Sequence, residues 1–179
     1  MSAVQIVIAG FGGQGILFAG KFLAYKGLLE DKAVSWLPSY GPEMRGGTAN
    51  CSVIVSDSPI GSPIISRPDV LMVMNLPSLD KFEAQVAPGG SIFIDSTLIA
   101  RKVQRTDVKV YYVPATRMAM EAGIPTLANM LLTGKLLRET PALCGGDWEA
   151  ALKKVVSARH AELLGYNLIA LQTGAAFEH

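Results

Sequence analysis

The residues best suited to chemistry form a glycine-rich turn near the start of the chain. Gly10, Gly12 and Gly15 have the spacing Gly-x-Gly-x-x-Gly, between a short apolar run and a segment with helical periodicity. Such glycines let backbone N–H groups and the positive end of a helix approach a phosphate. They equally permit a tight turn and close packing of the helix on a sheet. Both interpretations stay open for Gly10, Gly12, Gly13, Gln14 and Gly15.

A dinucleotide site would need an acidic residue at the end of the second strand, where it holds the adenosine ribose. The second apolar run instead ends at residues 36–39, which are Trp, Leu, Pro and Ser, while Glu30 and Asp31 come before it. The sequence therefore argues against an NAD(P)-dependent dehydrogenase.

The segment that follows has the densest group of charged and glycine residues. Glu43 and Arg45 lie two residues apart in a stretch too rich in glycine and proline for a helix or a central strand. An ion pair between them would only shape the loop, and from the residues alone this is the simpler interpretation. Alternatively, Arg45 binds a carboxylate or phosphate, or docks a partner chain. The candidate residues of this loop are Tyr40, Glu43, Arg45, Gly46 and Asn50.

One motif raises the possibility of a thiamine diphosphate site and then argues against it. Gly146-Asp147, with Asn167 twenty residues later, matches part of the pattern by which some enzymes hold magnesium and thiamine diphosphate. Trp148 stands where that pattern needs a glycine. We expect Asp147 to be the N-cap of a helix instead.

The metal-binding residue types are too few for a redox centre. Cys51 and Cys144 are the only cysteines, whereas an iron-sulfur cluster normally needs four thiolates. His160 and the terminal His179 are the only histidines, which argues against a histidine metal site or a catalytic triad. We therefore expect no metal, no cofactor and no catalytic residue in this chain alone.

The composition indicates one globular domain, spanning residues 1–179. Lys and Arg total 16 against 15 acidic residues, and they are scattered, so we expect neither nucleic acid nor a membrane surface as a partner. The uncharged first twenty residues contain five glycines and no preceding basic residues, unlike a membrane span or export signal. We expect a cytoplasmic, soluble protein.

Charged residues make up only 17% of the chain, below the roughly 25% usual for soluble domains. Strands buried on both faces would explain this, and so would a large permanent interface with other chains. Composition alone does not choose between them.

The elements expected around these residues belong to an α/β fold. Residues 1–37 read as a βαβ unit, residues 49–55 alternate like a half-buried strand, and residues 60–66 suit a short edge strand. Apolar runs at 70–74, 92–94 and 108–113 suit strands covered on both faces. We expect helices over 77–86, 116–122, 126–138, 148–157 and 158–177. This predicts a single Rossmann-like, mostly parallel sheet flanked by helices, with an antiparallel excursion after strand 2 and a helical C-terminal third.

Two blocks of the sequence resemble the gamma subunit of 2-oxoacid:ferredoxin oxidoreductases. The first is Gly10-Phe11-Gly12-Gly13-Gln14-Gly15, and the more distinctive second block runs from Tyr40 to Cys51. The resemblance also covers residues 52–57, Pro68-Asp69, and the helix that carries Asn129 and Gly134. The second block is more similar to the 2-oxoglutarate or broad 2-oxoacid branch than to the pyruvate branch.

The resemblance implies a complete enzyme that cleaves a 2-oxoacid on thiamine diphosphate, passes electrons through iron-sulfur clusters to ferredoxin, and transfers the acyl group to coenzyme A. The implied partners are alpha and beta subunits, and a delta subunit where one is present. These other subunits would hold the thiamine diphosphate, the magnesium and the iron-sulfur clusters. The glycine turn and the Tyr40–Asn50 loop would face these subunits or help to bind coenzyme A. The alternative from another class is a free-standing Rossmann-like module that binds a nucleotide or coenzyme A.

Overall fold

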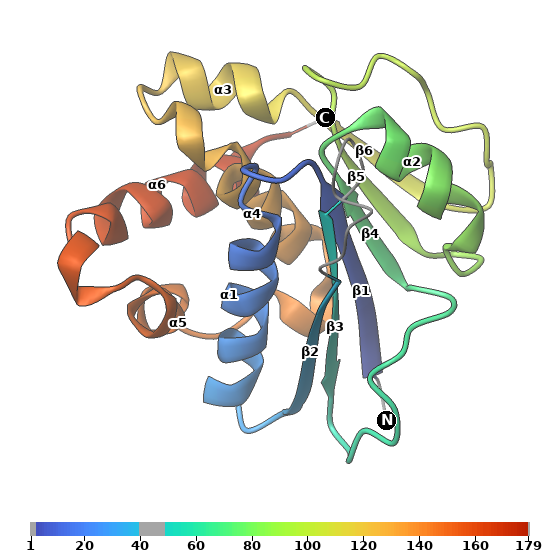
Figure 1. The fold of residues 1–179 in the computed structure, drawn as a ribbon, viewed down its shortest axis with the longest axis horizontal. Coiled ribbons are helices and arrows are strands. Elements are labelled where there is room, and N and C mark those ends of the chain that lie inside the picture. Colours follow the sequence, from blue (N-terminus) through green and yellow to red (C-terminus); the bar gives the residue numbers. More distant parts are fainter. Residues whose placement is uncertain (1–2, 40–48, 179) are drawn as a thin grey trace.

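The computed structural model describes residues 3–39 and 49–178, and these residues form one six-stranded sheet with helices on both faces (Figure 1). The strand order is β2-β3-β1-β4-β5-β6. The strands are β1 (Ala3–Gly10), β2 (Ala33–Ser39), β3 (Ala49–Ser56), β4 (Val70–Val73), β5 (Ser91–Asp95) and β6 (Lys109–Val113). The expected α/β class is therefore confirmed.

The sheet is mixed because β3 runs against its two neighbours. β1, β4, β5 and β6 are parallel, whereas β3 pairs antiparallel with both β1 and β2. The expected antiparallel excursion is thus confirmed. The prediction of a simple βαβ unit was incomplete, since β3 lies between β1 and β2 and splits the unit. Apolar patterns reveal that β1 and β2 are strands, but not that a later strand will insert between them.

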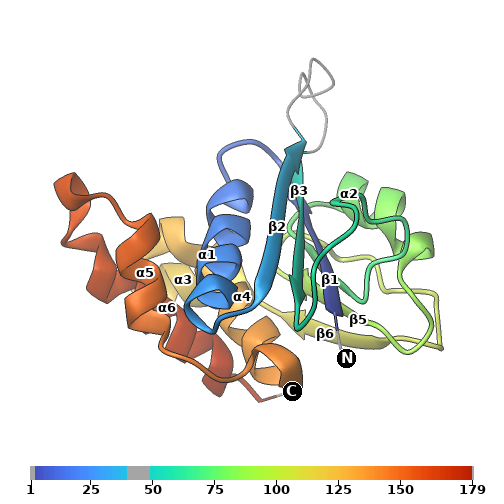
Figure 2. The same ribbon diagram turned by 90° about the horizontal axis from the view of Figure 1, so that it is seen from below.

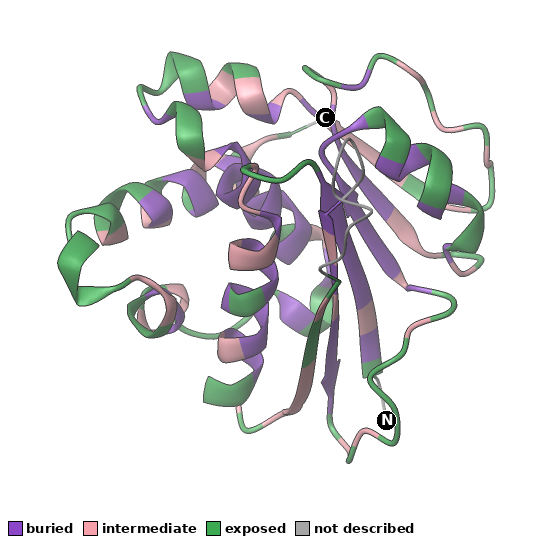
Figure 3. Cartoon of the chain, in the orientation of Figure 1, coloured by how far each residue is buried: buried purple, intermediate pink, exposed green. Residues whose placement is uncertain are grey.

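The sheet separates two hydrophobic layers. Along β1, Ile6 and Ile8 join the core beneath α1 (Ile16–Leu29), whereas Val7 and Ala9 join the core beneath α2 (Leu76–Phe82). Figure 2 shows α2 on one side of the sheet and the other labelled helices on the opposite side. Figure 3 shows the central strands almost wholly buried, which explains part of the low charged fraction.

The remaining helices all lie on the α1 side. They are α3 (Ala115–Glu121), α4 (Ala128–Glu139), α5 (Trp148–Val155) and α6 (Leu163–Ala176). In the described residues, four short 3₁₀ helices serve as connectors on either side of the sheet, such as Glu83–Gln85 after α2 and Ala158–His160 before α6. Glycines let α4 and α6 pack closely, because a Cβ at Gly134 would lie 2.0 Å from the carbonyl oxygen of Leu171. The helical C-terminal third is confirmed.

Two local expectations differ from the structure. Residues 60–66 form bends and irregular backbone, so the short edge strand expected there was wrong. Pro63 within that segment and Pro59 directly before it have no backbone N–H donor, which disfavours a ladder. The last helix begins at Leu163 and not at residue 158. In the described part of the chain, no helix has both the length and the apolar character needed to cross a bilayer.

Candidate functional site

The glycine turn and both described ends of the 40–48 segment lie at the same edge of the sheet. In the strand register Gly10 pairs with Ala49, and Ser39 pairs with Asn50. This is the edge where β1, β4, β5 and β6 end, and we call it the carboxyl edge (uppermost in Figure 1). Ligands and partners of open α/β sheets commonly bind at this edge.

Gln14 ties the glycine turn to the neighbouring strand. Its Oε1 accepts a hydrogen bond from the backbone N–H of Phe11 at 2.6 Å, and its Nε2 donates to the carbonyl oxygen of Met74 at 3.0 Å. Met74 directly follows β4, which lies beside β1. The side chain therefore closes the turn and fixes it against the next loop along the edge.

Close packing explains two of the glycines. A Cβ at Gly10 would lie 2.5 Å from Gln14 Oε1, and one at Gly15 would lie 2.3 Å from Asn129 Nδ2. Gly15 also has a φ of +75° and is the N-cap of α1, while the Nδ2 of Asn129 donates to the Gly15 carbonyl oxygen at 3.0 Å. Gly13 has a φ of +87° with open space around it. The turn thus needs glycine for its shape.

The start of α1 nevertheless leaves backbone donors available to a ligand. The first N–H groups of an α-helix have no intrahelical partners, and here no side chain caps them. Beside it lies a hollow of about 310 Å³, lined by glycine-turn residues, by Ala49 and by Ile16, Leu17 and Phe18. Among the described residues, its lining contains no charged side chain. The described groups that could hold an anion here are backbone N–H groups and the helix dipole.

The second candidate group lies mostly outside the described residues. Tyr40, Glu43, Arg45 and Gly46 fall in the 40–48 segment, for which the structure gives no description. Asn50 is described: it lies half-buried in β3, opposite Ala9 on one side and Ser39 on the other.

Three exposed apolar residues at this edge were missed by the sequence reasoning. Phe11, Leu76 and Leu98 follow β1, β4 and β5 and are 44%, 41% and 46% exposed. Phe11 and Leu98 lie in turns and Leu76 is the first residue of α2, so no periodic pattern marks them as a group. The strand order brings the three residues to the same edge, and no single segment of the sequence specifies that order.

The residues of the partial thiamine motif have structural roles. The Asp147 carboxylate accepts a hydrogen bond from the N–H of Ala150 at 2.9 Å, so the prediction that it caps α5 is confirmed. Asn167 is buried in α6, and its Nδ2 donates to the carbonyl oxygen of Leu163 at 2.8 Å. This pair does not fit a magnesium diphosphate.

The two cysteines do not fit a cluster either. Cys51 is buried in β3 with its Sγ 3.6 Å from the Ile16 carbonyl oxygen, whereas Cys144 is exposed. Burial raises the pKa of the Cys51 thiol to about 12, against a smaller opposing effect from Trp36, so the reactive thiolate is suppressed. Within residues 3–39 and 49–178, no three His, Cys, Asp or Glu side chains are grouped to hold a metal ion.

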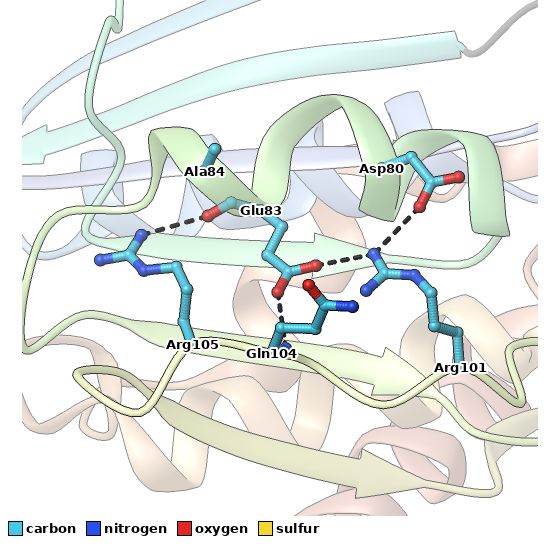
Figure 4. Close-up of a pocket in the computed structure, with 6 residues that line it drawn as sticks. All are labelled: Asp80, Glu83, Ala84, Arg101, Gln104 and Arg105. Atoms are coloured by element: carbon cyan, nitrogen blue, oxygen red, sulfur yellow. Dashed lines mark hydrogen bonds and ion pairs between the residues drawn. The ribbon is translucent and has the colours of Figure 1, made fainter.

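A recess of about 390 Å³ beside α2 holds a cluster of charged side chains (Figure 4). The Glu83 carboxylate accepts hydrogen bonds from Arg101 at 2.6 Å and from the Gln104 N–H at 2.9 Å. Arg101 also pairs with Asp80, and Arg105 donates to the Glu83 carbonyl oxygen. Burial acts to raise the pKa of Glu83, but these partners together hold it below its ordinary value. The cluster fastens the 101–105 loop to α2.

The sequence matches the family model described as pyruvate ferredoxin/flavodoxin oxidoreductase over residues 5–177. The 2-oxoglutarate synthase subunit KorC of Methanocaldococcus jannaschii is 35% identical, over 95% of this chain and 91% of KorC. The ketoisovalerate oxidoreductase subunit VorA of Methanothermobacter thermautotrophicus is 40% identical, over 96% of this chain. That match takes in only 36% of VorA, so this chain spans about a third of the length of this relative.

Solved structures share the fold. The gamma subunit of a keto/oxoacid ferredoxin oxidoreductase from Geobacter sulfurreducens has a TM-score of 0.79 and 28% identity, over 96% of both chains. The 2-oxoglutarate:ferredoxin oxidoreductase from Magnetococcus marinus has a TM-score of 0.85 at 22% identity, over 98% of this chain and 31% of that one. The similar domain thus occurs both as a separate subunit and within longer chains. This chain belongs to the pyruvate ferredoxin/flavodoxin oxidoreductase family.

Proposed function

We propose that this chain is the gamma subunit, without redox centres of its own, of a multi-subunit 2-oxoacid:ferredoxin oxidoreductase. The complex would decarboxylate a 2-oxoacid oxidatively and transfer the acyl group to coenzyme A. The observation that carries the proposal is the match to nearly the whole of KorC, at 35% identity. A free-standing nucleotide-binding module is not favoured, since that match is to a subunit of an oxidoreductase.

In this proposal the other subunits supply the cofactors. Asp147 caps a helix, and Cys51 and Cys144 lie apart, so neither group suits thiamine diphosphate, magnesium or an iron-sulfur cluster. The alpha and beta subunits, and a delta subunit where present, would hold these groups and pass electrons to ferredoxin. Relatives act on 2-oxoglutarate or on ketoisovalerate by their names, so the preference for 2-oxoglutarate stays a prediction.

The contribution of this chain would be a shaped surface beside the reaction. Two parts of the chain are proposed to face the catalytic subunits. They are the glycine turn and the loop residues Tyr40, Glu43, Arg45, Gly46 and Asn50. The shared edge of Gly10, Ala49 and Asn50 supports this placement. The free N–H groups at the start of α1 are the proposed contact for a phosphate of coenzyme A.

Co-purification of the tagged chain from its own cells tests the proposal. The expected result is recovery of other subunits of one oxidoreductase, together with reduction of ferredoxin or viologen that depends on a 2-oxoacid and coenzyme A. Recovery of this chain alone, from cells that express the complete set of genes, would contradict it. Assays with several 2-oxoacids would then identify the substrate.

Calorimetry of the isolated chain separates the proposal from the alternative. A free-standing module would bind coenzyme A without partners, whereas a gamma subunit whose site is completed by other subunits would bind it weakly or not at all. Tight binding of NADH would instead support an NAD(P)-dependent dehydrogenase, the interpretation that the sequence argues against.

Arg45→Ala in the purified complex tests the segment between β2 and β3. Loss of assembly or of turnover is expected, with Arg67→Ala, at an exposed position before β4, as the matched control. If Arg45→Ala left both assembly and turnover at the level of the control, the loop would have no part in the proposed function.

A further inference from the structure

The outer strand β2 has a neighbouring strand on only one of its two long sides. Among the described residues it pairs with β3 alone, so the backbone groups on its other side, which we call the free side, have no ladder partner. Natural proteins usually protect such a strand from pairing with charged side chains, bulges or a covering segment. The seven residues of β2 include no charged side chain, and its register with β3 contains no bulge.

The opposite outer strand, β6, is protected in these ways. It has only five residues and begins with Lys109. The loop before it is fastened against it, since the Val103 N–H donates to the Tyr112 hydroxyl at 2.9 Å and Lys102 Nζ lies 3.9 Å from the centre of the Tyr112 ring. The contrast singles out β2 as the outer strand that is open to pairing.

Pro38 indicates which backbone groups of β2 point to the free side. A proline has no N–H, so within a ladder it takes a position whose nitrogen points away from the neighbouring strand. The register with β3 continues across Pro38. Because backbone groups alternate in direction along a strand, the N–H and C=O groups of Val34 and Trp36 point to the same side as Pro38. The free side of β2 therefore offers the N–H donors of Val34 and Trp36.

An antiparallel copy of the same strand satisfies both donors. When Ser35 lies opposite Ser35 of a second copy, Val34 of each copy lies opposite Trp36 of the other. Each of these two pairs exchanges two hydrogen bonds, and the missing N–H of Pro38 is not needed.

The side chains match in the same register. Trp36, which is 36% exposed, lies beside Val34 of the second copy, and Leu37, which is 43% exposed, lies beside Ala33. A large apolar side chain thus meets a smaller one on each face, and such cross-strand pairs stabilise a sheet. The sequence of β2 is therefore complementary to itself.

The helices leave room for this pairing. A Cβ at Gly20 would contact Cys51 and Trp36, and one at Gly27 would contact Val34, so α1 lies over β2 and β3. In a continued sheet the α1 helices of the two copies would lie about three strand spacings, or roughly 14 Å, apart. That distance exceeds the diameter of a helix, about 10–12 Å.

We infer that two copies of this chain pair through β2, antiparallel about a two-fold axis at Ser35, and continue one sheet across both molecules. Such an interface uses the same residues on both sides and closes after two copies. The inference goes beyond the proposed function: a complex that contains this chain would hold two copies of it, joined directly.

A disulfide at the two-fold axis tests the register. Ser35→Cys is made in a chain that also carries Cys144→Ser, which removes the exposed native cysteine and leaves the buried Cys51. The two Ser35 Cα atoms would lie about 4.5 Å apart, within the range of a disulfide, so oxidation should link two chains. Leu37→Cys in the same background is the matched control, because its two copies would lie roughly 14 Å apart and should not link.

The stability of the dimer is a second measurement. Sedimentation of the wild-type chain at about 100 μM should show mostly dimer. Leu37→Lys should raise the dissociation constant about tenfold or more, because it replaces an apolar contact with a charge on the free strand. Ile169→Lys, at a residue 50% exposed on α6, is the matched control and should dimerise like the wild type.

Several results would overturn the inference without touching the proposed function. They are a wild-type chain that stays monomeric at every concentration, a Leu37→Lys variant that dimerises like Ile169→Lys, and linking at residue 37 that equals or exceeds linking at residue 35. Ser35→Cys is also oxidised in the complex recovered from cells. Linking there supports the inference, whereas linking only in the isolated chain would assign β2 to a strand of another subunit and overturn it.

Discussion

The carboxyl edge of this sheet and the opposite edge, where the parallel strands begin and which we call the amino edge, are stabilised by different means. At the carboxyl edge neutral groups fit closely, as where Gly15 meets Asn129 and where Gln14 bridges two turns. At the amino edge exposed ion pairs such as Lys32 with Asp57 flank the strands. This difference shows that the low charged fraction of the chain has a local origin. It reflects strands buried on both faces and the uncharged residues that directly follow β1, β4 and β5.

The largest effect is expected from Gly15→Ala. The new methyl group would lie 2.3 Å from Asn129 Nδ2 and would force an alanine into a φ of +75°. Left-handed strain and overpacking together should lower the free energy of unfolding by about 2–4 kcal/mol. Gly13→Ala has the same strain but open space, so it should cost only about 1–2 kcal/mol. Urea unfolding measures both, and equal losses would show that packing at Asn129 is unimportant.

A smaller loss is expected from Gln14→Ala, which removes the bridge between Phe11 and Met74. Two hydrogen bonds disappear, so the free energy of unfolding should fall by about 1–2 kcal/mol. Gln14→Glu keeps the acceptor for the Phe11 N–H but loses the donor to Met74. Thermal unfolding should place it between the wild type and Gln14→Ala; a variant as stable as the wild type would argue against the bridge.

A comparable loss is expected from Glu83→Gln, because this carboxylate is largely buried between Arg101 and the Gln104 N–H. The free energy of unfolding at pH 7 should fall by about 1–2 kcal/mol. Since the pKa of Glu83 is lower in the folded chain than its ordinary value of 4.5, the carboxylate stabilises the fold above that pH. Its contribution should fade as the pH falls through the lowered pKa. Urea unfolding from pH 7 to pH 3 should show the wild type and the variant converging, and a constant difference would contradict this.

The smallest effect is expected from Lys32→Ala at the amino edge. Lys32 and Asp57 form an ion pair in which both side chains are solvent-accessible, and water and salt screen such pairs. The Asp57 carboxylate raises the pKa of Lys32, so any stabilisation is present at neutral pH and is lost only in strong alkali. Thermal unfolding at pH 7 should match the wild type. A clear loss of stability would show that substitutions at the amino edge destabilise the fold as much as those at the carboxyl edge.

Local patterns predicted much of the fold and some of the site. The apolar runs located β4, β5 and β6, and the Asp147 cap was recognised because capping depends on neighbouring residues only. The insertion of β3 between β1 and β2 depends on strand order, and so does the placement of Phe11, Leu76 and Leu98 at one edge. Strand order arises from long-range pairing that no single segment encodes. The roles of Glu43 and Arg45, and the extent of the domain over residues 1–179, stay predictions.

The most direct test of the account is an anaerobic assay of viologen reduction with a 2-oxoacid and coenzyme A. Three samples are compared: this chain alone, the partner subunits alone, and the reconstituted mixture. We predict no reduction by the chain alone and a rate in the mixture well above that of the partner subunits. Reduction of the acceptor by the lone chain, at a rate like that of the mixture, would contradict the claim that this subunit contributes surface and not redox chemistry.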